Sequence, residues 1–261
     1  MKRVFPILVV GALLIGVIGT LPARADKACD VALATIAKAN TTLSQLQELG
    51  AAIRKRQQDL IAAAPSTPGT PAKAGAFVTL DLQPKANQAL SDDLHDEQGN
   101  NFKNLPQGEQ TLAGVAFKIG PKMVHMRGAH APNSPDKVEG LPVQGSVSRL
   151  HLLHGTGYNL DAATEIGAYI VHYADGTTER IPIVYGEDVR DWWNEPTPDL
   201  KRARLGWTGT NPAAAGNQSS IHLYILDWTN PHPDKPISSL DFTSSNTECD
   251  PFLVALSLER P

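Results

Sequence analysis

The side chains best suited to binding a ligand are aromatic and polar residues next to turn signals in the second half of the chain. All four tryptophans lie there, and Trp207 is flanked by glycine and threonine rather than by apolar residues. Aromatic rings can stack on the apolar faces of a ligand, while acids, arginine and imidazole groups bind its polar groups. The candidate ligand-binding residues are therefore Trp207, Trp192, Tyr158, His154, Arg149 and Glu187, which His130 and Asn133 could join.

Each of these tryptophans could instead be a core residue. Trp192 and Trp193 are adjacent, and adjacent side chains of a strand point to opposite faces. We therefore expect one of the two to be buried and the other to lie at the surface, and the sequence leaves open which one.

The acidic residues give only a weak case for catalysis. Four carboxylates lie in one short segment, whereas a glycosidase needs two that face each other across a cleft. The chain contains no G-x-S-x-G motif of the serine hydrolases. A polysaccharide hydrolase that uses residues 187–195 stays an alternative, and its carboxylates are Glu187, Asp188, Asp191 and Glu195.

Two further groups could hold a metal ion. His151 and His154 form an H-x-x-H motif, but strand residues three apart point to opposite faces and cannot share an ion without a bend. The acidic segment 92–101 offers the oxygen ligands that Ca²⁺ prefers, although it lacks the spacing of an EF-hand. Its candidate ligands for a structural calcium are Asp92, Asp93 and Asp96.

The N-terminus has the three parts of a secretory signal. Lys2 and Arg3 precede the apolar residues 4–21, and Ala23 and Ala25 form an A-x-A cleavage site. We expect residues 1–25 to be removed and the protein to be secreted or periplasmic, the alternative being an uncleaved membrane anchor. Removal would leave 20 basic and 27 acidic residues, a net charge of −7. Such a chain is not expected to bind nucleic acid or to insert into a membrane.

Two cysteines, Cys29 and Cys249, remain after this cleavage. In an oxidising compartment they predict one intramolecular disulfide, the alternatives being two buried free thiols or an intermolecular bridge.

The rest of the chain divides into three segments. Residues 27–64 are rich in alanine and carry leucines at three- and four-residue steps, which predicts helix. This helix either forms a homo-oligomer as a short coiled coil, or it folds onto the main domain or extends as a stalk. Residues 65–76 form a linker by their proline, alanine and threonine content, and a main domain follows over 77–261.

The main domain is predicted to be all β. Period-two alternation is clearest around 168–184, where Asp175 and Gly176 separate two alternating runs and predict a hairpin with a type I′ turn. The high content of glycine (21) and proline (20) also suits a turn-rich fold. We expect an antiparallel β-sandwich with strands in the segments 77–82, 111–119, 122–126, 147–154, 167–173, 177–185, 219–227, 237–243 and 252–259.

An ordered series of motifs resembles a known domain type. The motifs are LDLQPKAN (80–87), NLPQGEQTLAGVAF (104–117), VEGLPV (138–143), VHYADGT (171–177), YGEDVRDWW (185–193) and WTNPHP (228–233). Together they resemble the secreted bacterial galactose-binding-like jelly-roll domains that occur appended to glycoside hydrolases. The resemblance covers residues 77–261, and it implies a jelly-roll fold, carbohydrate binding and a structural calcium, but no catalytic residues.

The sequence as a whole therefore predicts an exported, non-catalytic carbohydrate-binding module. A structural or protein-interaction module, assembled through residues 27–64, is the other alternative besides the hydrolase.

Overall fold

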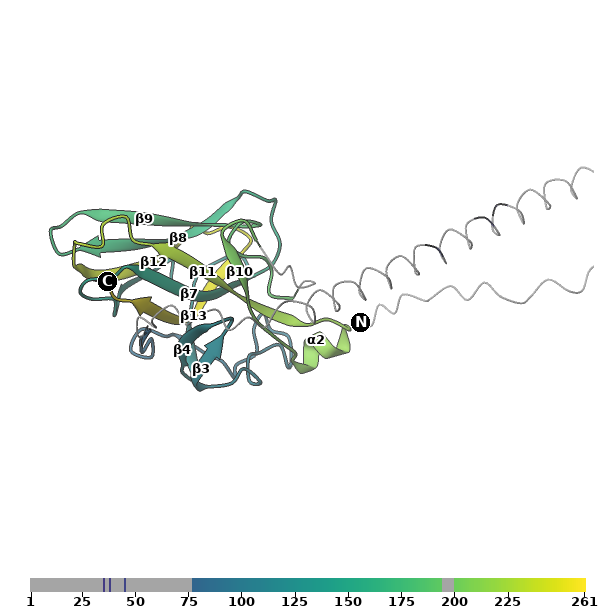
Figure 1. Cartoon of the computed structure of the whole chain (residues 1–261). Coiled ribbons are helices and arrows are strands. Elements are labelled where there is room, and N and C mark those ends of the chain that lie inside the picture. The colour runs from purple at the N-terminus through teal and green to yellow at the C-terminus, as the bar shows by residue number, and fades with distance from the viewer. Residues whose placement is uncertain (1–34, 36–37, 39–44, 46–76, 194–199) are drawn as a thin grey trace, which may run out of the picture. The chain divides into compact units, whose positions relative to one another are not determined.

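The computed structural model describes residues 35, 38, 45, 77–193 and 200–261 (Figure 1). The chain separates into two compact units, Met1–Thr70 and Pro71–Pro261. The predicted signal, most of the predicted helix and the linker lie outside the described residues. All the strands that the structure describes belong to the second unit.

The larger of its two main sheets has seven antiparallel strands in the order β10-β11-β7-β13-β5-β2, with β1 also paired to β13. Its centre is formed by the two long strands β7 and β13, which pair from Arg149–Glu259 to Gly157–Asp250. The strands are β1 (Val78–Thr79), β2 (Gln88–Ala89), β5 (Lys122–His125), β7 (Arg149–Gly157), β10 (Ala203–Gly209), β11 (Ile221–Thr229) and β13 (Asp250–Glu259).

A second sheet of four antiparallel strands covers one face of the first. Its order is β6-β12-β8-β9, and its strands are β6 (Lys137–Leu141), β8 (Glu165–Tyr173), β9 (Thr178–Val184) and β12 (Ile237–Ser244). The first hydrophobic core lies between the two sheets, where Leu152 and Leu256 of the large sheet pack with Tyr169 and Phe242 of the small one. This pair of sheets is the sandwich that the sequence predicts.

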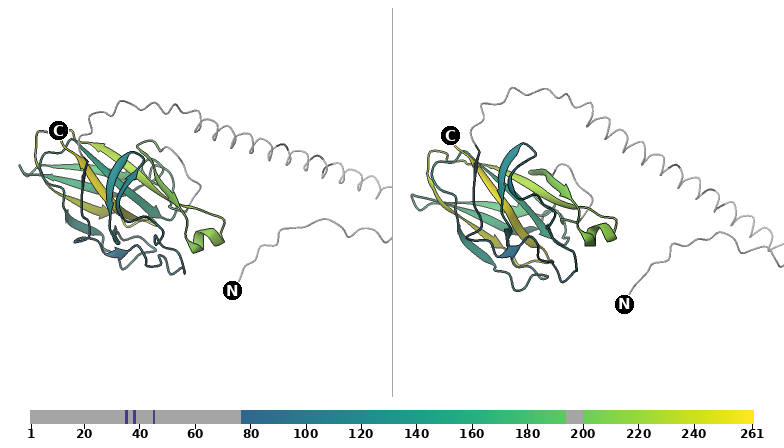
Figure 2. Two further views of the ribbon diagram at one scale, coloured as in Figure 1. Left: turned by 60° about the horizontal axis from the view of Figure 1, so that its bottom comes forward. Right: turned by 90° about the horizontal axis from the view of Figure 1, so that it is seen from below.

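The opposite face of the large sheet is covered by a hairpin, β3 (Gly108–Leu112) and β4 (Val115–Ile119), and by the segment 90–105. Figure 1 shows the resulting three layers, with β8 and β9 on one side of β7 and β13 and the hairpin on the other, and Figure 2 shows the hairpin from below. A second core fills this space, in which Phe102, Phe117 and Trp192 pack against Leu223 and Phe252 of the large sheet.

The predicted hairpin over 168–184 is confirmed as β8 and β9, but its turn differs from the expected type. Gly176 alone has a positive φ, +85°, and its N–H donates to the carbonyl of Tyr173. A type I′ turn needs positive φ at both central residues, so the hairpin instead has a longer loop that ends in a left-handed glycine. The two-residue left-handed turn occurs at Ala113 and Gly114, inside the segment predicted as one strand over 111–119.

Four elements were not predicted, namely strands β2, β6 and β10 and the helix α2. Residues 203–209 form strand β10, although the sequence suggests a loop around Trp207 because of its neighbouring glycines. A short helix, α2 (Pro212–Gly216), follows it, and Asn211 caps this helix by accepting a hydrogen bond from the Ala214 N–H. None of the described helical residues belongs to a helix that is long and apolar enough to cross a membrane.

Candidate functional site

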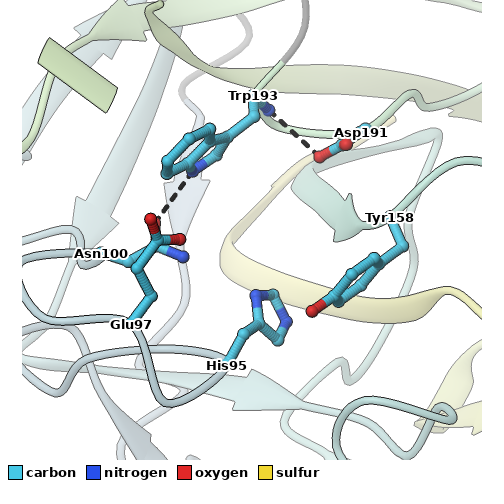
Figure 3. A pocket seen from close by; sticks show the side chains of 6 residues that line it. All are labelled: His95, Glu97, Asn100, Tyr158, Asp191 and Trp193. Atoms are coloured by element: carbon cyan, nitrogen blue, oxygen red, sulfur yellow. Dashed lines mark hydrogen bonds between the residues drawn. The ribbon is translucent and has the colours of Figure 1, made fainter. Parts of the chain in front are cut away.

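Two neighbouring cavities share His95 as a common wall. The first, here called the aromatic pocket, has a volume of about 180 Å³ and is lined by His95, Glu97, Asn100, Tyr158, Asp191 and Trp193 (Figure 3). The second, here called the histidine pocket, has a volume of about 270 Å³, and its lining includes Asp93, His95, Asp96, His125, His130 and Asn133. Segments far apart in the sequence therefore meet at one place.

Trp193 is held at the aromatic pocket by its buried neighbour Trp192 and by a hydrogen bond to the distant residue Asn100. The Trp192 N–H donates to the carbonyl of Thr156, and Trp192 is only 1% exposed within the second core. Trp193 is partly exposed, and its indole Nε1 donates to Asn100 Oδ1 over 2.8 Å (Figure 3). The buried anchor at Trp192 and the hydrogen bond to Asn100 thus fix the ring of Trp193 in the wall of the pocket.

Tyr158 forms another wall, directly after the end of β7. Its φ is +63°, in the left-handed region that non-glycine residues rarely adopt. Its ring stacks on His130 at a centroid distance of 3.5 Å and meets the ring of His95 edge-on at 4.8 Å. His95 and Asp96 also have positive φ values, 59° and 54°. Strained backbone of this kind concentrates at functional sites, which favours a functional role for this region.

Asp191 contributes the half-buried carboxylate of the aromatic pocket. Its Oδ1 accepts a hydrogen bond from the Trp193 N–H over 3.2 Å. Burial raises the pKa of the Asp191 carboxyl; the hydrogen bond to Trp193 and the charge of His95 offset this only in part. Glu97 is exposed at the same pocket. The pocket therefore combines two acidic side chains with the rings of a tyrosine and a tryptophan.

A cluster of two histidines and one aspartate lies at the histidine pocket. Asp250 Oδ2 accepts hydrogen bonds from Nε2 of His125 over 2.6 Å and from Nε2 of His95 over 2.8 Å. Asp250 is 0% exposed. Burial by itself would raise the pKa of its carboxyl, but the hydrogen bonds from His125 and His95 outweigh it and lower the pKa. One ligand atom from each of the three residues lies within 4.8 Å of the others.

The structure brings only one of the six predicted ligand-binding residues, Tyr158, to the aromatic pocket. Trp192 and His154 are each 1% exposed and belong to the interior. The neighbour Trp193, rather than Trp192, offers its ring to the pocket, which decides the alternative that the sequence left open. Trp207 lies on β10 with its ring over Gly209, and it does not line either pocket.

The two predicted charged residues also lie elsewhere. Arg149 begins β7, at the opposite end of the strand from Tyr158, roughly 30 Å away at 3.3 Å per residue. Glu187 forms ion pairs with Lys201 and Arg202. Glu187 lines neither pocket, and Glu195, another carboxylate of the hydrolase alternative, lies outside the described residues.

The predicted calcium ligands do not converge. Asp92 accepts a hydrogen bond from Gln88, Asp93 accepts one from Asn101, and all three aspartates are exposed. Among the described residues, the group that could hold a metal ion consists of His95, His125 and Asp250, and only His95 belongs to the acidic segment. His130 and Asn133, which the sequence suggests could join the ligand-binding residues, line the histidine pocket.

The predicted disulfide is not present at Cys249. This residue is a free, buried thiol whose Sγ donates to the carbonyl of Tyr158 over 3.2 Å, and Cys29 lies outside the described residues. Burial raises the pKa of the Cys249 thiol to about 12, so the thiol stays protonated at neutral pH.

Sequence reasoning missed Trp193, Asp191, His125 and Asp250 as parts of one site. One sequence feature could have indicated part of the site: a histidine, His95, stands among four acidic residues. Ligand sets that combine histidine with carboxylate favour transition metals over calcium. His125 and Asp250 gave no local signal, because each stands in an apolar strand and meets the other only through sheet pairing.

No protein-family model matches this chain, and no curated protein matches it either.

Proposed function

We propose that this protein binds carbohydrate without catalysis, and that the aromatic pocket holds one sugar unit. The observation that carries the proposal is the arrangement of Trp193 and Tyr158, two rings from distant segments, around the carboxylates of Asp191 and Glu97. Aromatic faces bind the C–H surfaces of a sugar ring, and carboxylates accept hydrogen bonds from its hydroxyls.

The size and preorganisation of the pocket support this proposal. Its volume of about 180 Å³ is below the range of about 300–1,000 Å³ typical of drug-sized ligands, so it suits one small polar unit rather than a large cofactor. Trp193 is fixed by Asn100 and Tyr158 is stacked on His130, so neither ring has to be ordered when the ligand binds. A binding site that is already ordered loses less free energy on binding.

The sequence motifs of residues 77–261 support the same proposal, because they resemble galactose-binding-like jelly rolls, and an antiparallel sandwich is compatible with that relationship. Export through the predicted signal at 1–25 and homo-oligomerisation through 27–64 complete the proposal. They rest on the sequence alone.

A glycan array probed with the full chain tests the proposal. We expect binding to a restricted set of glycans, and competition by one free monosaccharide. An array without signal, at protein concentrations that detect weak lectins, would instead favour a protein-interaction module. Release of a shorter product from a bound glycan would favour the hydrolase alternative.

A further inference from the structure

We propose that His95, His125 and Asp250 bind a divalent transition-metal ion, with Zn²⁺ and Co²⁺ as probes. This site adjoins the aromatic pocket through the shared residue His95, but the inference does not depend on carbohydrate binding. Imidazole nitrogens together with one carboxylate are the donor set that zinc and non-haem iron prefer. Three features of the cluster support such a site.

The first feature is the convergence of the ligand atoms. Nε2 of His95 and Nε2 of His125 both point at the same oxygen of Asp250, over 2.8 and 2.6 Å. Two ligands that each lie about 2.0–2.1 Å from a tetrahedral zinc ion are about 3.3 Å from each other. An ion at this position therefore replaces the two hydrogen bonds once each imidazole Nε2 moves roughly half an ångström away from Asp250 Oδ2.

The second feature is the unpaired half of the Asp250 carboxylate. Asp250 is 0% exposed, and its Oδ1 has no hydrogen-bond partner within the part of the chain that the structure describes. Its ion-pair partners among the described residues are His95 and His125 alone, and these carry a charge only when protonated. A buried carboxylate without a fixed positive partner is costly, and a divalent cation supplies the missing charge.

The third feature is the space around the cluster. Gly157 is the register partner of Asp250 across the sheet, and a Cβ at this position would lie 2.5 Å from Asp250 Oδ1 and 2.7 Å from His95 Cε1. The absence of a side chain at Gly157 therefore leaves the room that the carboxylate and the imidazole occupy. His95 and His125 also line the histidine pocket, so coordination positions that the protein does not fill are open to water or a small ligand.

A second buried histidine shows that two carboxylate neighbours do not by themselves make such a site. His151 contacts Asp227 through Nδ1 over 2.6 Å and Glu259 through Nε2 over 2.9 Å. The carboxylates of Asp227 and Glu259 contact opposite nitrogens of the His151 ring, so the three side chains cannot coordinate the same ion. His151 therefore provides a matched control.

The test is a titration of the full chain, stripped with a chelator and dialysed, with Co²⁺ followed by its visible absorption and then with Zn²⁺ in competition. We expect one Co²⁺ per chain, displaced by Zn²⁺ but not by an equal concentration of Ca²⁺. His125→Gln keeps a side-chain N–H for Asp250 and removes the imidazole, so it should weaken Co²⁺ binding by at least about 100-fold, since even indirect partners of metal ligands cost 10–100-fold. His151→Gln should leave the affinity unchanged.

His95→Asn serves as the second variant, because asparagine tolerates the left-handed φ of residue 95 but is too short to reach the ion. It decides the result if His125→Gln fails to fold. The proposal is overturned if the wild-type chain binds no Co²⁺, if both histidine variants bind it as tightly as the wild type, or if Ca²⁺ displaces it at equal concentration.

Discussion

The indole N–H of Trp193 donates to the side-chain oxygen of Asn100, 2.8 Å away, across a gap of 93 positions in the sequence. Asn100 is buried, and its own amide donates to the carbonyl of Leu94. The hydrogen bond therefore connects the ring of Trp193 to the segment that also carries His95 and Glu97. This hydrogen bond holds two walls of the aromatic pocket together, although they come from separate parts of the chain.

Gly157 should tolerate no side chain. In Gly157→Ala the new Cβ would meet Asp250 Oδ1 at 2.5 Å, and we expect the free energy of unfolding to fall by about 1–3 kcal/mol, as measured by urea denaturation. Gly216→Ala is the matched control, because Gly216 ends helix α2 with no atom near its Cβ position. It should be neutral or stabilising by up to about 1 kcal/mol. Equal effects of the two substitutions would contradict the described packing around Asp250.

His154 should make the protein less stable in mild acid. Burial lowers its pKa to about 4, while its Nε2–H donates to the carbonyl of Asp188 and Tyr169 lies at Nδ1. The unfolded chain protonates His154 near pH 6.5, whereas the folded chain does so only near pH 4. The contribution of neutral His154 to the free energy of unfolding is therefore fully present above pH 6.5 and is lost as the pH falls toward 4. The loss attributable to His154 is about 3 kcal/mol.

The measurement is urea denaturation of the wild type and of His154→Gln between pH 7 and pH 4. The glutamine keeps a donor for the Asp188 carbonyl but does not titrate in this range. The wild type should lose more stability than the variant across this interval. Parallel pH profiles would show that His154 is not buried in its neutral form.

Cys249 should react with a thiol reagent only after unfolding. Its Sγ is buried, and a thiol with a pKa of about 12 provides almost no thiolate at neutral pH. Alkylation with iodoacetamide, followed by peptide mass mapping, should label Cys249 in denaturant and leave it unlabelled in buffer. A peptide in which Cys249 is linked to Cys29 would instead establish the disulfide that the sequence suggests.

The fold was predictable where the local pattern was strong. The alternation of Tyr169, Val171 and Tyr173 with the following Asp-Gly identifies β8 and β9, because a half-buried strand must alternate and a tight turn needs glycine. β10 was not predicted because Gly206 and Gly209 suggest a loop; they are required instead by close packing, against Ile225 and against the ring of Trp207 respectively.

The site was largely unpredictable for a different reason. The aromatic pocket needs the left-handed turn after β7, the hydrogen bond between Asn100 and Trp193 and the bridge between Thr156 and Asp191. The hydrogen bond and the bridge each join segments that are far apart in the sequence, and the local spacing of residues does not contain such contacts. Tyr158 was found because its own neighbours signal a polar turn, whereas Trp193 could not be separated from Trp192 until one of them was seen to be buried.

The affinity of one array-identified sugar for the wild type and three tryptophan variants is the sharpest test of sugar binding in the aromatic pocket. By isothermal titration, Trp193→Ala should raise Kd by roughly 30-fold, which is about 2 kcal/mol, because the ring forms a wall of the pocket. Trp193→Phe keeps an aromatic face and should lose much less, and Trp207→Ala, outside both pockets, should bind as the wild type does. If Trp207→Ala abolishes binding while Trp193→Ala leaves it intact, the sugar does not bind in the aromatic pocket.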